Sequence, residues 1–391
     1  MKKYITPALA ALALGTVMTA MPAWSQTQGV SDTEIVIGGH HDLSGIFAAF
    51  SVPAVKAAEH YFKEVNDKGG VHGRKIKYVV EDHGYNVSKV GPAVNKLVNR
   101  DKIFAALLSL GTPHNLAAFK ITDAKGIPNI SPLTAARQMI QEPLDLHYAG
   151  TSSYYDQIRE AVKYLKENAG TTTVCSMLIA NDYGVEVQSG AKDEAAASGL
   201  NYAAETTHKP DDADFVGSLS KLKAEGCNLV AMALGVRQTL TVLGTAKKMG
   251  LSDMKFLGAS ASFHTVIAKA GEGKLAEGFY AAAGWQDVEA RMDNPVLAEW
   301  VKSFSDFAGA KMMGSGALLG RSAAELFVRA VEAAGKDLTS ESFQQAMESL
   351  EYDDDIMGNK VKMGPGDHVA AESIYISQVV NGAWKTLATI D

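Results

Sequence analysis

Apolar and polar positions along the chain follow a repeating order of strand and helix. Short β-branched runs, typical of buried strands, alternate with longer stretches in which apolar residues recur at helical spacing. Strands that alternate with helices in this way favour a parallel, doubly wound sheet. For the first part of the chain the pattern predicts strands at 34–38, 75–82, 104–109 and 127–130, and helices at 52–66, 89–99 and 115–125.

The same order begins again near residue 155, which predicts a second, similar unit. Its expected strands are 173–180, 201–207, 228–234 and 254–257, and its expected helices are 155–168, 185–198, 215–225 and 238–249. Mainly helical segments are expected at 278–283, 295–307, 316–334 and 340–350, and a terminal hairpin at 372–387. The chain is therefore predicted to be an α/β protein with two doubly wound, flavodoxin-like lobes.

No stretch rich in Pro, Gly or Ser separates the two units, so we expect strand-like crossovers rather than a flexible tether. Two rigid lobes joined in this way form a cleft where the carboxyl ends of both sheets face each other. The expected first lobe comprises residues 26–150 and 281–348. The expected second lobe comprises residues 151–280 and 349–391.

The beginning of the chain predicts export. Two lysines precede an uncharged run from Ile5 to Thr19, and Ala23-Trp24-Ser25 follows with small residues at the cleavage spacing. We therefore expect a signal peptide over residues 1–25. An uncleaved membrane anchor is the alternative, but the run is short and contains a proline and a glycine. The expected product is an exported protein, periplasmic in a cell with two membranes.

Composition and charge narrow the possible partners. The 391 residues are 47% hydrophobic and 21% charged, which is ordinary for a globular protein with a full core. The net charge of -7 provides no basic field for a phosphate backbone, so we expect no nucleic-acid partner. No later apolar stretch reaches the roughly 20 residues that span a bilayer, so we expect no membrane insertion after cleavage.

The predicted fold places the two cysteines of the chain on neighbouring parts of one sheet. Cys175 opens the first strand of the second unit, and Cys227 precedes its third strand. First and third strands are neighbours in the flavodoxin-like order, so the two thiols come within reach of a disulfide. An oxidising compartment permits this bond without requiring it. Two buried free thiols are the alternative, and the sequence leaves both open.

A search for catalytic motifs finds no constellation that would support an enzyme. Nucleotide-binding, zinc-protease and nucleophile-elbow spacings are absent from the sequence. Ser218 to Lys221 matches S-x-x-K but falls on a predicted surface helix. The acidic run 353–355 lacks the alternating spacing of a calcium loop, and His40 and His41, adjacent on a strand, point to opposite faces. We expect no catalytic residues, metal or cofactor, and favour a binding protein.

The chain resembles periplasmic solute-binding proteins of the branched-chain amino acid (leucine/isoleucine/valine) type, which serve ABC importers. The resemblance covers nearly the whole mature chain and includes the string Gly-Gly-Val-His-Gly-Arg-Lys-Ile at 69–76. The other segments that carry it are 34–38, 43–45, 65–68, 80–82, 130–132 and 181–184. It implies a type I periplasmic binding fold with three crossovers and a hinge that closes on the ligand.

The resemblance also implies which residues bind. Family members hold the ligand carboxylate with hydroxyl and backbone N–H groups of the loops after the first lobe's strands. In this chain the expected contacts from these loops are Ser109, Gly111, Thr112, Thr134 and Ala135. The expected aromatic contacts are Phe50, Tyr183 and, at the mouth near the first crossover, Tyr154 and Tyr155. Core packing is the alternative for each aromatic.

The sequence departs from the family where the ligand's ammonium group would bind. The amino-acid binders place an acidic residue where this chain has Ser260, and a tyrosine where it has Arg237. An ammonium buried without a counter-charge is costly, so we expect a small organic anion, aromatic or dicarboxylic, rather than leucine. Ser260 and Arg237 join the expected contacts, with Arg237 pairing a ligand carboxylate. The alternative is an arginine at the start of a surface helix that faces water.

These observations predict the extracytoplasmic solute-binding component of an ABC importer. We expect a monomer that closes on a small carboxylate-bearing ligand and docks on an inner-membrane permease. Three alternatives remain: an amino-acid-binding protein of the same importer class, a ligand sensor for a membrane receptor, and an exported hydrolase. A transcription regulator of similar architecture is disfavoured, because the chain begins with an export signal instead of a helix-turn-helix.

Overall fold

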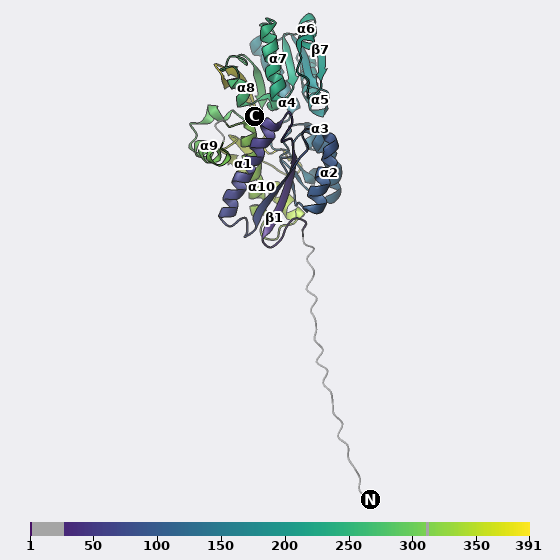
Figure 1. Cartoon of the computed structure of the whole chain (residues 1–391), viewed down its shortest axis with the longest axis vertical. Coiled ribbons are helices and arrows are strands. Elements are labelled where there is room, and N and C mark those ends of the chain that lie inside the picture. Colours follow the sequence, from purple (N-terminus) through teal and green to yellow (C-terminus); the bar gives the residue numbers. More distant parts are fainter. Residues whose placement is uncertain (2–26, 310–312) are drawn as a thin grey trace.

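The structure is a computed structural model that describes Met1 and residues 27–309 and 313–391. It has two α/β lobes, which Figure 1 shows one above the other. The first lobe contains β1, α1, α2 and α10, and the second contains β7, α6 and α7. The expected signal peptide, apart from Met1, lies outside the described residues.

The first lobe is built on a five-stranded sheet in the order β2-β1-β3-β4-β5, with every pair of neighbours parallel. This is the expected flavodoxin-like order. The strands are β1 (Glu34–His41), β2 (Lys75–Asp82), β3 (Ala106–Leu107), β4 (Asn129–Ile130) and β5 (His147–Tyr148). The helices are α1 (Ala48–Asp67), α2 (Val90–Asn95), α3 (Thr112–Thr122), α10 (Ser315–Ala334) and α11 (Ser340–Met347).

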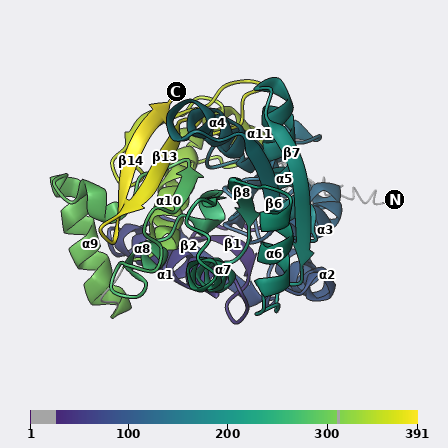
Figure 2. The same cartoon turned by 90° about the horizontal axis from the view of Figure 1, so that it is seen from above.

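The second lobe contains a seven-stranded sheet in the order β14-β13-β10-β9-β8-β6-β7. Its parallel strands are β6 (Thr173–Ile179), β7 (Asn201–His208), β8 (Leu229–Ala233), β9 (Lys255–Gly258) and β10 (Tyr280–Ala283). The predicted terminal hairpin adds β13 (Ile374–Val380) and β14 (Ala383–Ile390) at the edge opposite β7, as Figure 2 shows. The helices are α4 (Tyr154–Ala169), α5 (Asp182–Ala197), α6 (Val216–Ala224), α7 (Val236–Lys248) and α8 (Thr265–Lys269). Helix α9 (Pro295–Ala308) packs against α1 of the first lobe, where Ser303 Oγ and His60 Nε2 are hydrogen-bonded at 3.2 Å.

The segment 278–283, expected to be helical, instead contains strand β10. Three of its residues are alanines, which favour helix in isolation, but each is fully buried between β9 and β13. Tertiary pairing therefore overrides local propensity here. A small hairpin of β11 (Glu351–Asp354) and β12 (Asn359–Lys362) lies outside both sheets.

Local signals set where the cleft helices begin. The Ser153 hydroxyl accepts a hydrogen bond from the Asp156 N–H and caps α4, which ends at Gly170 in the left-handed conformation. The Asn181 side chain caps α5 in the same way, through the N–H of Gly184. Both helices start at the lobe interface, so Tyr154, the first residue of α4, and Tyr183, the second residue of α5, lie at the cleft.

The chain crosses between the lobes three times within the described residues, and the crossovers lie side by side. The Ala149 N–H donates to the His368 carbonyl at 2.9 Å, and Asn359 Nδ2 donates to the Gly284 carbonyl at 2.7 Å. The expected boundary at residue 281 falls inside β10. Past the expected boundary at 349, Val361 and Met363 still pack in the core of the first lobe.

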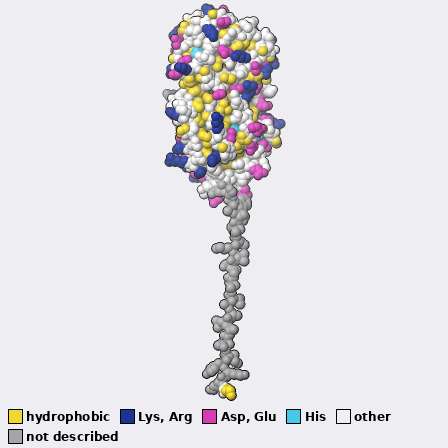
Figure 3. Space-filling view, turned by 90° about the vertical axis from the view of Figure 1, so that its right-hand side faces the viewer, with side chains coloured by type: hydrophobic (Ala, Val, Ile, Leu, Met, Phe, Trp, Pro, Cys, Tyr) yellow, Lys and Arg dark blue, Asp and Glu magenta, His cyan; other side chains and the backbone are white. Residues whose placement is uncertain are grey.

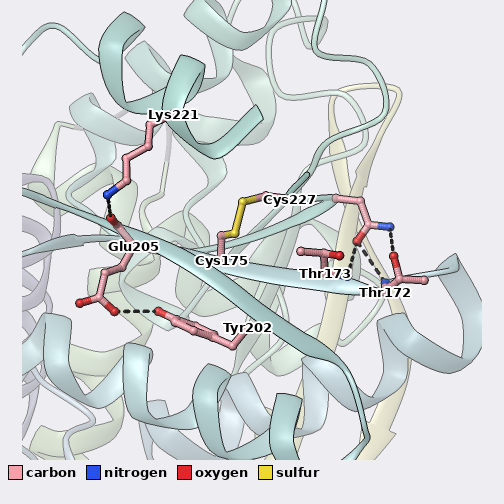
Figure 4. Close-up of a disulfide and its surroundings, with 8 residues drawn as sticks. Thr172, Thr173, Cys175, Tyr202, Glu205, Lys221 and Cys227 are labelled. Carbon is pink, nitrogen blue, oxygen red and sulfur yellow. Dashed lines mark hydrogen bonds between the residues drawn. A yellow bond between two sulfur atoms is a disulfide. The ribbon is translucent and has the colours of Figure 1, made fainter. Parts of the chain in front are cut away.

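The cysteines of the second lobe form a disulfide, shown in Figure 4. Strand β6, which carries Cys175, pairs in parallel with β8, which follows Cys227, and the two Cα atoms are 5.8 Å apart. Of the two arrangements that the sequence left open, the structure has the bonded one. The disulfide joins β6 to the segment that leads into the neighbouring strand β8.

The face of the molecule shown in Figure 3 carries both positive and negative charge. On the face in Figure 3, basic and acidic side chains both occur over both lobes, with apolar side chains between them. Within the described residues no helix combines the length and hydrophobicity needed to cross a membrane.

Candidate functional site

A cavity lies between the two lobes, at the carboxyl ends of their strands. It encloses about 560 Å³ of space free of protein atoms, including its open mouth. Both lobes and two of the crossovers contribute to its walls. The lining residues are Phe47, Phe50, Tyr85, Leu110, Gly111, Thr112, Pro132, Leu133, Thr134, Ala135, Thr151, Tyr154, Tyr183, Ser260, Ala261, Trp285 and Leu319.

Aromatic rings form much of the wall. The Phe47 ring lies 4.7 Å from that of Tyr85 and 6.1 Å from that of Tyr183, and the Tyr154 and Tyr183 rings are 4.9 Å apart between centroids. Phe47 and Tyr85 belong to the first lobe, and Tyr154 and Tyr183 to the second, so the contact between Phe47 and Tyr183 forms only when the lobes are together. Such walls suit a ligand with a flat or bulky apolar part.

Hydroxyl and backbone groups of the first lobe provide the polar part of the wall. Thr112 Oγ1 and Thr134 Oγ1 are hydrogen-bonded at 2.7 Å. The backbone N–H groups of Thr112 and Thr134 donate to no other described residue, whereas that of Ala135 is hydrogen-bonded to the Tyr154 hydroxyl. Unpaired N–H groups at the start of a helix, such as α3 at Thr112, favour an anion without any basic side chain.

The start of α3 requires glycine. Gly111 has a φ of 98°, and a Cβ at this position would lie 2.5 Å from His114 Nδ1. The glycine therefore allows the loop after β3 to approach the cavity closely.

No side chain among the described lining residues carries a charge. Burial raises the pKa of the Tyr154 and Tyr183 phenols above their ordinary value, so both stay neutral at physiological pH. The cavity therefore offers neither a carboxylate for an ammonium group nor a cation for an acid.

Three polar atoms of the wall have no partner among the described residues. Trp285 Nε1, Thr151 Oγ1 and the Tyr183 hydroxyl are buried and make no hydrogen bond to a described residue. Leaving such a buried group unpaired costs about 1–3 kcal/mol, and native structures contain few of them. All three atoms are candidates for contact with a ligand.

Most of the sequence-predicted contacts line the cavity, and three do not. Phe50, Gly111, Thr112, Thr134, Ala135, Tyr183 and Ser260 belong to the wall, as does Tyr154.

The predictions for Ser109 and Tyr155 are wrong. The Ser109 hydroxyl accepts a hydrogen bond from the His40 N–H at 3.3 Å, inside the first lobe. Tyr155 follows Tyr154 on α4, where successive side chains point about 100° apart. Its hydroxyl donates to Asp193 Oδ2 at 2.7 Å, and the Arg137 guanidinium covers its ring at 3.5 Å. It therefore lies outside the cavity.

The prediction for Arg237 is also wrong. Arg237 is the second residue of α7 and is exposed, whereas its neighbours Val236 and Gln238 are buried. The side chain therefore faces water, as in the alternative interpretation. Recognition of an acid in this cavity has to rely on neutral donors.

Several lining residues were missed. Phe47 precedes Phe50 by three residues, a spacing that places both on one helical face, so it could have been found. Thr151 and Trp285 lie on crossovers that meet only in the folded chain, and no local pattern marks them. The remaining missed residues are Tyr85, Leu110, Pro132, Leu133, Ala261 and Leu319.

Direct bonds join the lobes around the cavity. Asn181 Nδ2, at the start of α5, donates to the hydroxyl of Tyr85 in the first lobe at 3.2 Å. The Arg137 side chain, from the loop after β4, forms a bidentate pair with Glu186 of α5. The structure is therefore closed over the cavity.

Comparisons with known proteins agree with this architecture. A family model described as periplasmic binding protein matches residues 34–383. An amino acid binding protein of Pseudomonas aeruginosa is 23% identical over 229 residues, which is 59% of either chain. The Leu/Ile/Val-binding protein of Escherichia coli is 23% identical over 257 residues, 65% of this chain and 69% of that protein. The chain thus matches less than two thirds of the Pseudomonas relative.

Solved structures share the fold over nearly the whole chain. A fatty acid ABC transporter substrate-binding protein from Thermomonospora curvata is 25% identical, with a TM-score of 0.84 and 93% of each chain covered. A branched-chain amino acid ABC transporter protein from Thermus thermophilus with bound valine is 23% identical, with a TM-score of 0.82 and coverage of 92% and 96%. A solute-binding protein from R. palustris in complex with benzoate is 19% identical, with a TM-score of 0.80 and coverage of 91% and 96%.

Proposed function

The chain belongs to the periplasmic binding protein family, and on that basis we propose that it is the solute-binding component of an ABC importer. In this proposal it is exported to the periplasm, closes on a small carboxylate-bearing ligand and delivers it to a membrane permease. An organic acid with an aromatic or other apolar body is the favoured ligand. The observation that carries this choice is the uncharged, aromatic-walled cavity with unpaired backbone N–H groups.

The absence of charge from the described lining residues argues against a standard amino acid. An ammonium group buried in this cavity would lack a counter-charge, which is costly in a wall of this polarity. A carboxylate can instead accept hydrogen bonds from the backbone N–H groups of Thr112 and Thr134. Such fixed donors form charge-assisted bonds without requiring a cation. Two of the structural relatives, the fatty acid ABC transporter substrate-binding protein and the solute-binding protein in complex with benzoate, are consistent with this ligand class.

An amino acid is the second candidate, since several relatives bear the names of amino-acid binders. In that case carbonyl and hydroxyl oxygens of the wall would have to hold the ammonium group. The two candidates differ in their ligands but not in the transport role.

A thermal-shift screen separates them. Mature protein, unfolded to strip bound ligand and refolded, is tested against leucine, other amino acids, aromatic carboxylates, dicarboxylates and sugars. Ligand at a thousandfold excess over its Kd stabilises the native state by about 4 kcal/mol, so a true ligand gives a clear rise in Tm. We expect a shift with an aromatic or organic acid and none with leucine. A leucine shift without any acid shift would contradict the proposed ligand class.

A further inference from the structure

Trp285 is held in the wall of the cavity at the second crossover. It follows Gly284, whose carbonyl accepts the hydrogen bond from Asn359 Nδ2 at 2.7 Å. Its ring centroid lies 6.2 Å from that of Phe263, and only 2% of the residue is exposed. The indole is therefore fixed in position, while its N–H has no protein acceptor among the described residues.

The first crossover brings a second polar group to the same place. A Cβ at Gly284 would come within 1.6 Å of Thr151 Oγ1, so the two crossovers touch where the glycine stands. Thr151 lines the cavity beside Trp285, and its hydroxyl also lacks a partner. The hinge wall thus carries two unpaired polar groups, one on each of two crossovers that are in contact, and neither belongs to the first lobe's loops that supply the N–H donors.

The chemistry of these groups defines what they can bind. An indole N–H only donates, so it needs an acceptor, whereas a threonine hydroxyl both donates and accepts. Neither carries charge, which suits a neutral oxygen such as a hydroxyl, ether or carbonyl. A purely hydrocarbon body would leave both groups unpaired in the bound state.

We infer that Trp285 and Thr151 bind a second oxygen of the ligand, distinct from its carboxylate, so that the preferred cargo is an oxygen-substituted aromatic or organic acid. This inference rests on the proposed function, since it assumes that the cavity binds an acid. The Trp285 N–H donates a hydrogen bond to this oxygen, and the Thr151 hydroxyl donates to it or accepts from it. Trp285 and Thr151 are then specificity-determining residues.

The test compares benzoate with its 3-hydroxy, 4-hydroxy and 4-methoxy derivatives by calorimetry on ligand-stripped mature protein. We expect at least one derivative to bind about tenfold or more tightly than benzoate. Trp285→Phe keeps an aromatic ring but removes the N–H, so it should abolish most of that preference while changing benzoate affinity by less than about threefold. Thr151→Val, which removes only the hydroxyl, should reduce the same preference and provides a second variant if Trp285→Phe fails to fold.

A matched control is available at Trp300 of α9. Its indole N–H is likewise buried and unpaired, but the residue lies outside the cavity, so Trp300→Phe should leave every affinity unchanged. If Trp285→Phe lowered the affinity for benzoate and for its derivatives by the same factor, the inference would be overturned, because Trp285 would then bind the carboxylate that all of them share. An undiminished preference in both variants would overturn it as well. Failure of every acid, with binding of an amino acid, would overturn the proposed ligand class on which the inference rests and leave the transport role standing.

Discussion

Tyr85 and Asn181 join the two lobes through a hydrogen bond of 3.2 Å, donated by the Asn181 amide to the tyrosine hydroxyl. Tyr85 follows β2 in the first lobe, and Asn181 caps α5 in the second. The Tyr85 ring also packs 4.7 Å from Phe47 in the cavity wall. Since hinge opening would separate the two residues, this bond belongs to the closed state.

Loss of the Tyr85 hydroxyl should therefore weaken ligand binding. Tyr85→Phe keeps the ring and removes one interlobe hydrogen bond, worth about 1 kcal/mol, so we expect a three- to tenfold rise in Kd. The unfolding free energy without ligand should change by less than about 1 kcal/mol. Calorimetry and denaturant melts measure the two quantities. Tyr202→Phe, which loses a tyrosine hydroxyl bonded to Glu205 at 3.3 Å outside the cavity, is the control. Equal affinities for Tyr85→Phe and wild type would contradict the prediction.

The ion pair between Arg137 and Glu186 should contribute to stability. The Glu186 side chain is 3% exposed and receives bonds from the Arg137 guanidinium and backbone N–H. Arg137→Gln would leave a buried carboxylate without its counter-charge. A fully buried pair would lose about 3–5 kcal/mol, but Arg137 is half exposed, so we expect about 2 kcal/mol. Urea unfolding measures the change. Lys302→Gln, in an exposed pair with Asp306, should lie within about 0.5 kcal/mol of wild type, and an Arg137→Gln variant equally close would refute the role.

The strand order was predictable from sequence because buried strands and the helices between them leave a periodic pattern. The placement of Cys175 and Cys227 on neighbouring strands followed from that order. The direction of each side chain was harder to predict from the sequence. Tyr155 and Arg237 lie at the cleft ends of α4 and α7, as expected, but their side chains point away from the cavity. One residue of helical phase decides between cavity and solvent. No local pattern in the sequence marks Trp285. Its place in the cavity depends on two crossovers that are far apart in the sequence and meet only in the folded chain.

The disulfide should stabilise the second lobe without affecting recognition. It closes a loop with a sequence separation of 52, for which loss of the bond costs about 2–4 kcal/mol. Since Cys175 is fully buried, replacement of both residues by alanine is a cleaner test than added reductant. Urea unfolding should show the loss of stability, and calorimetry should show unchanged ligand affinity, because neither cysteine lines the cavity. Equal unfolding midpoints for the variant and wild type would contradict a stabilising role.

Four buried histidines beside the cavity should make stability depend on pH. The His83 ring stacks on His114 at 4.3 Å and lies 5.3 Å from His40, and His114 packs 4.5 Å from Tyr85. Burial lowers the pKa of His40 well below its ordinary value, that of His41 and His83 to about 3, and that of His114 to about 4. Neighbouring imidazoles add to the effect, and Asp82 partly opposes it for His41 and His83. His41, His83 and His114 are therefore neutral in the folded protein at pH 5, and burial favours the neutral form of His40 as well.

The direction of this pH dependence follows from the protons that the histidines take up when the protein unfolds. Below pH 6.5 the unfolded chain protonates these histidines and the folded chain does not, so stability is complete above pH 6.5 and falls toward pH 4. Each histidine adds up to about 1.4 kcal/mol per pH unit to this slope. Urea unfolding at pH 7, 6 and 5 measures it. His114→Asn should reduce the slope by one histidine's share. A wild-type stability that stays level from pH 7 to pH 5 would mean that the cluster is already charged or hydrated in the folded protein.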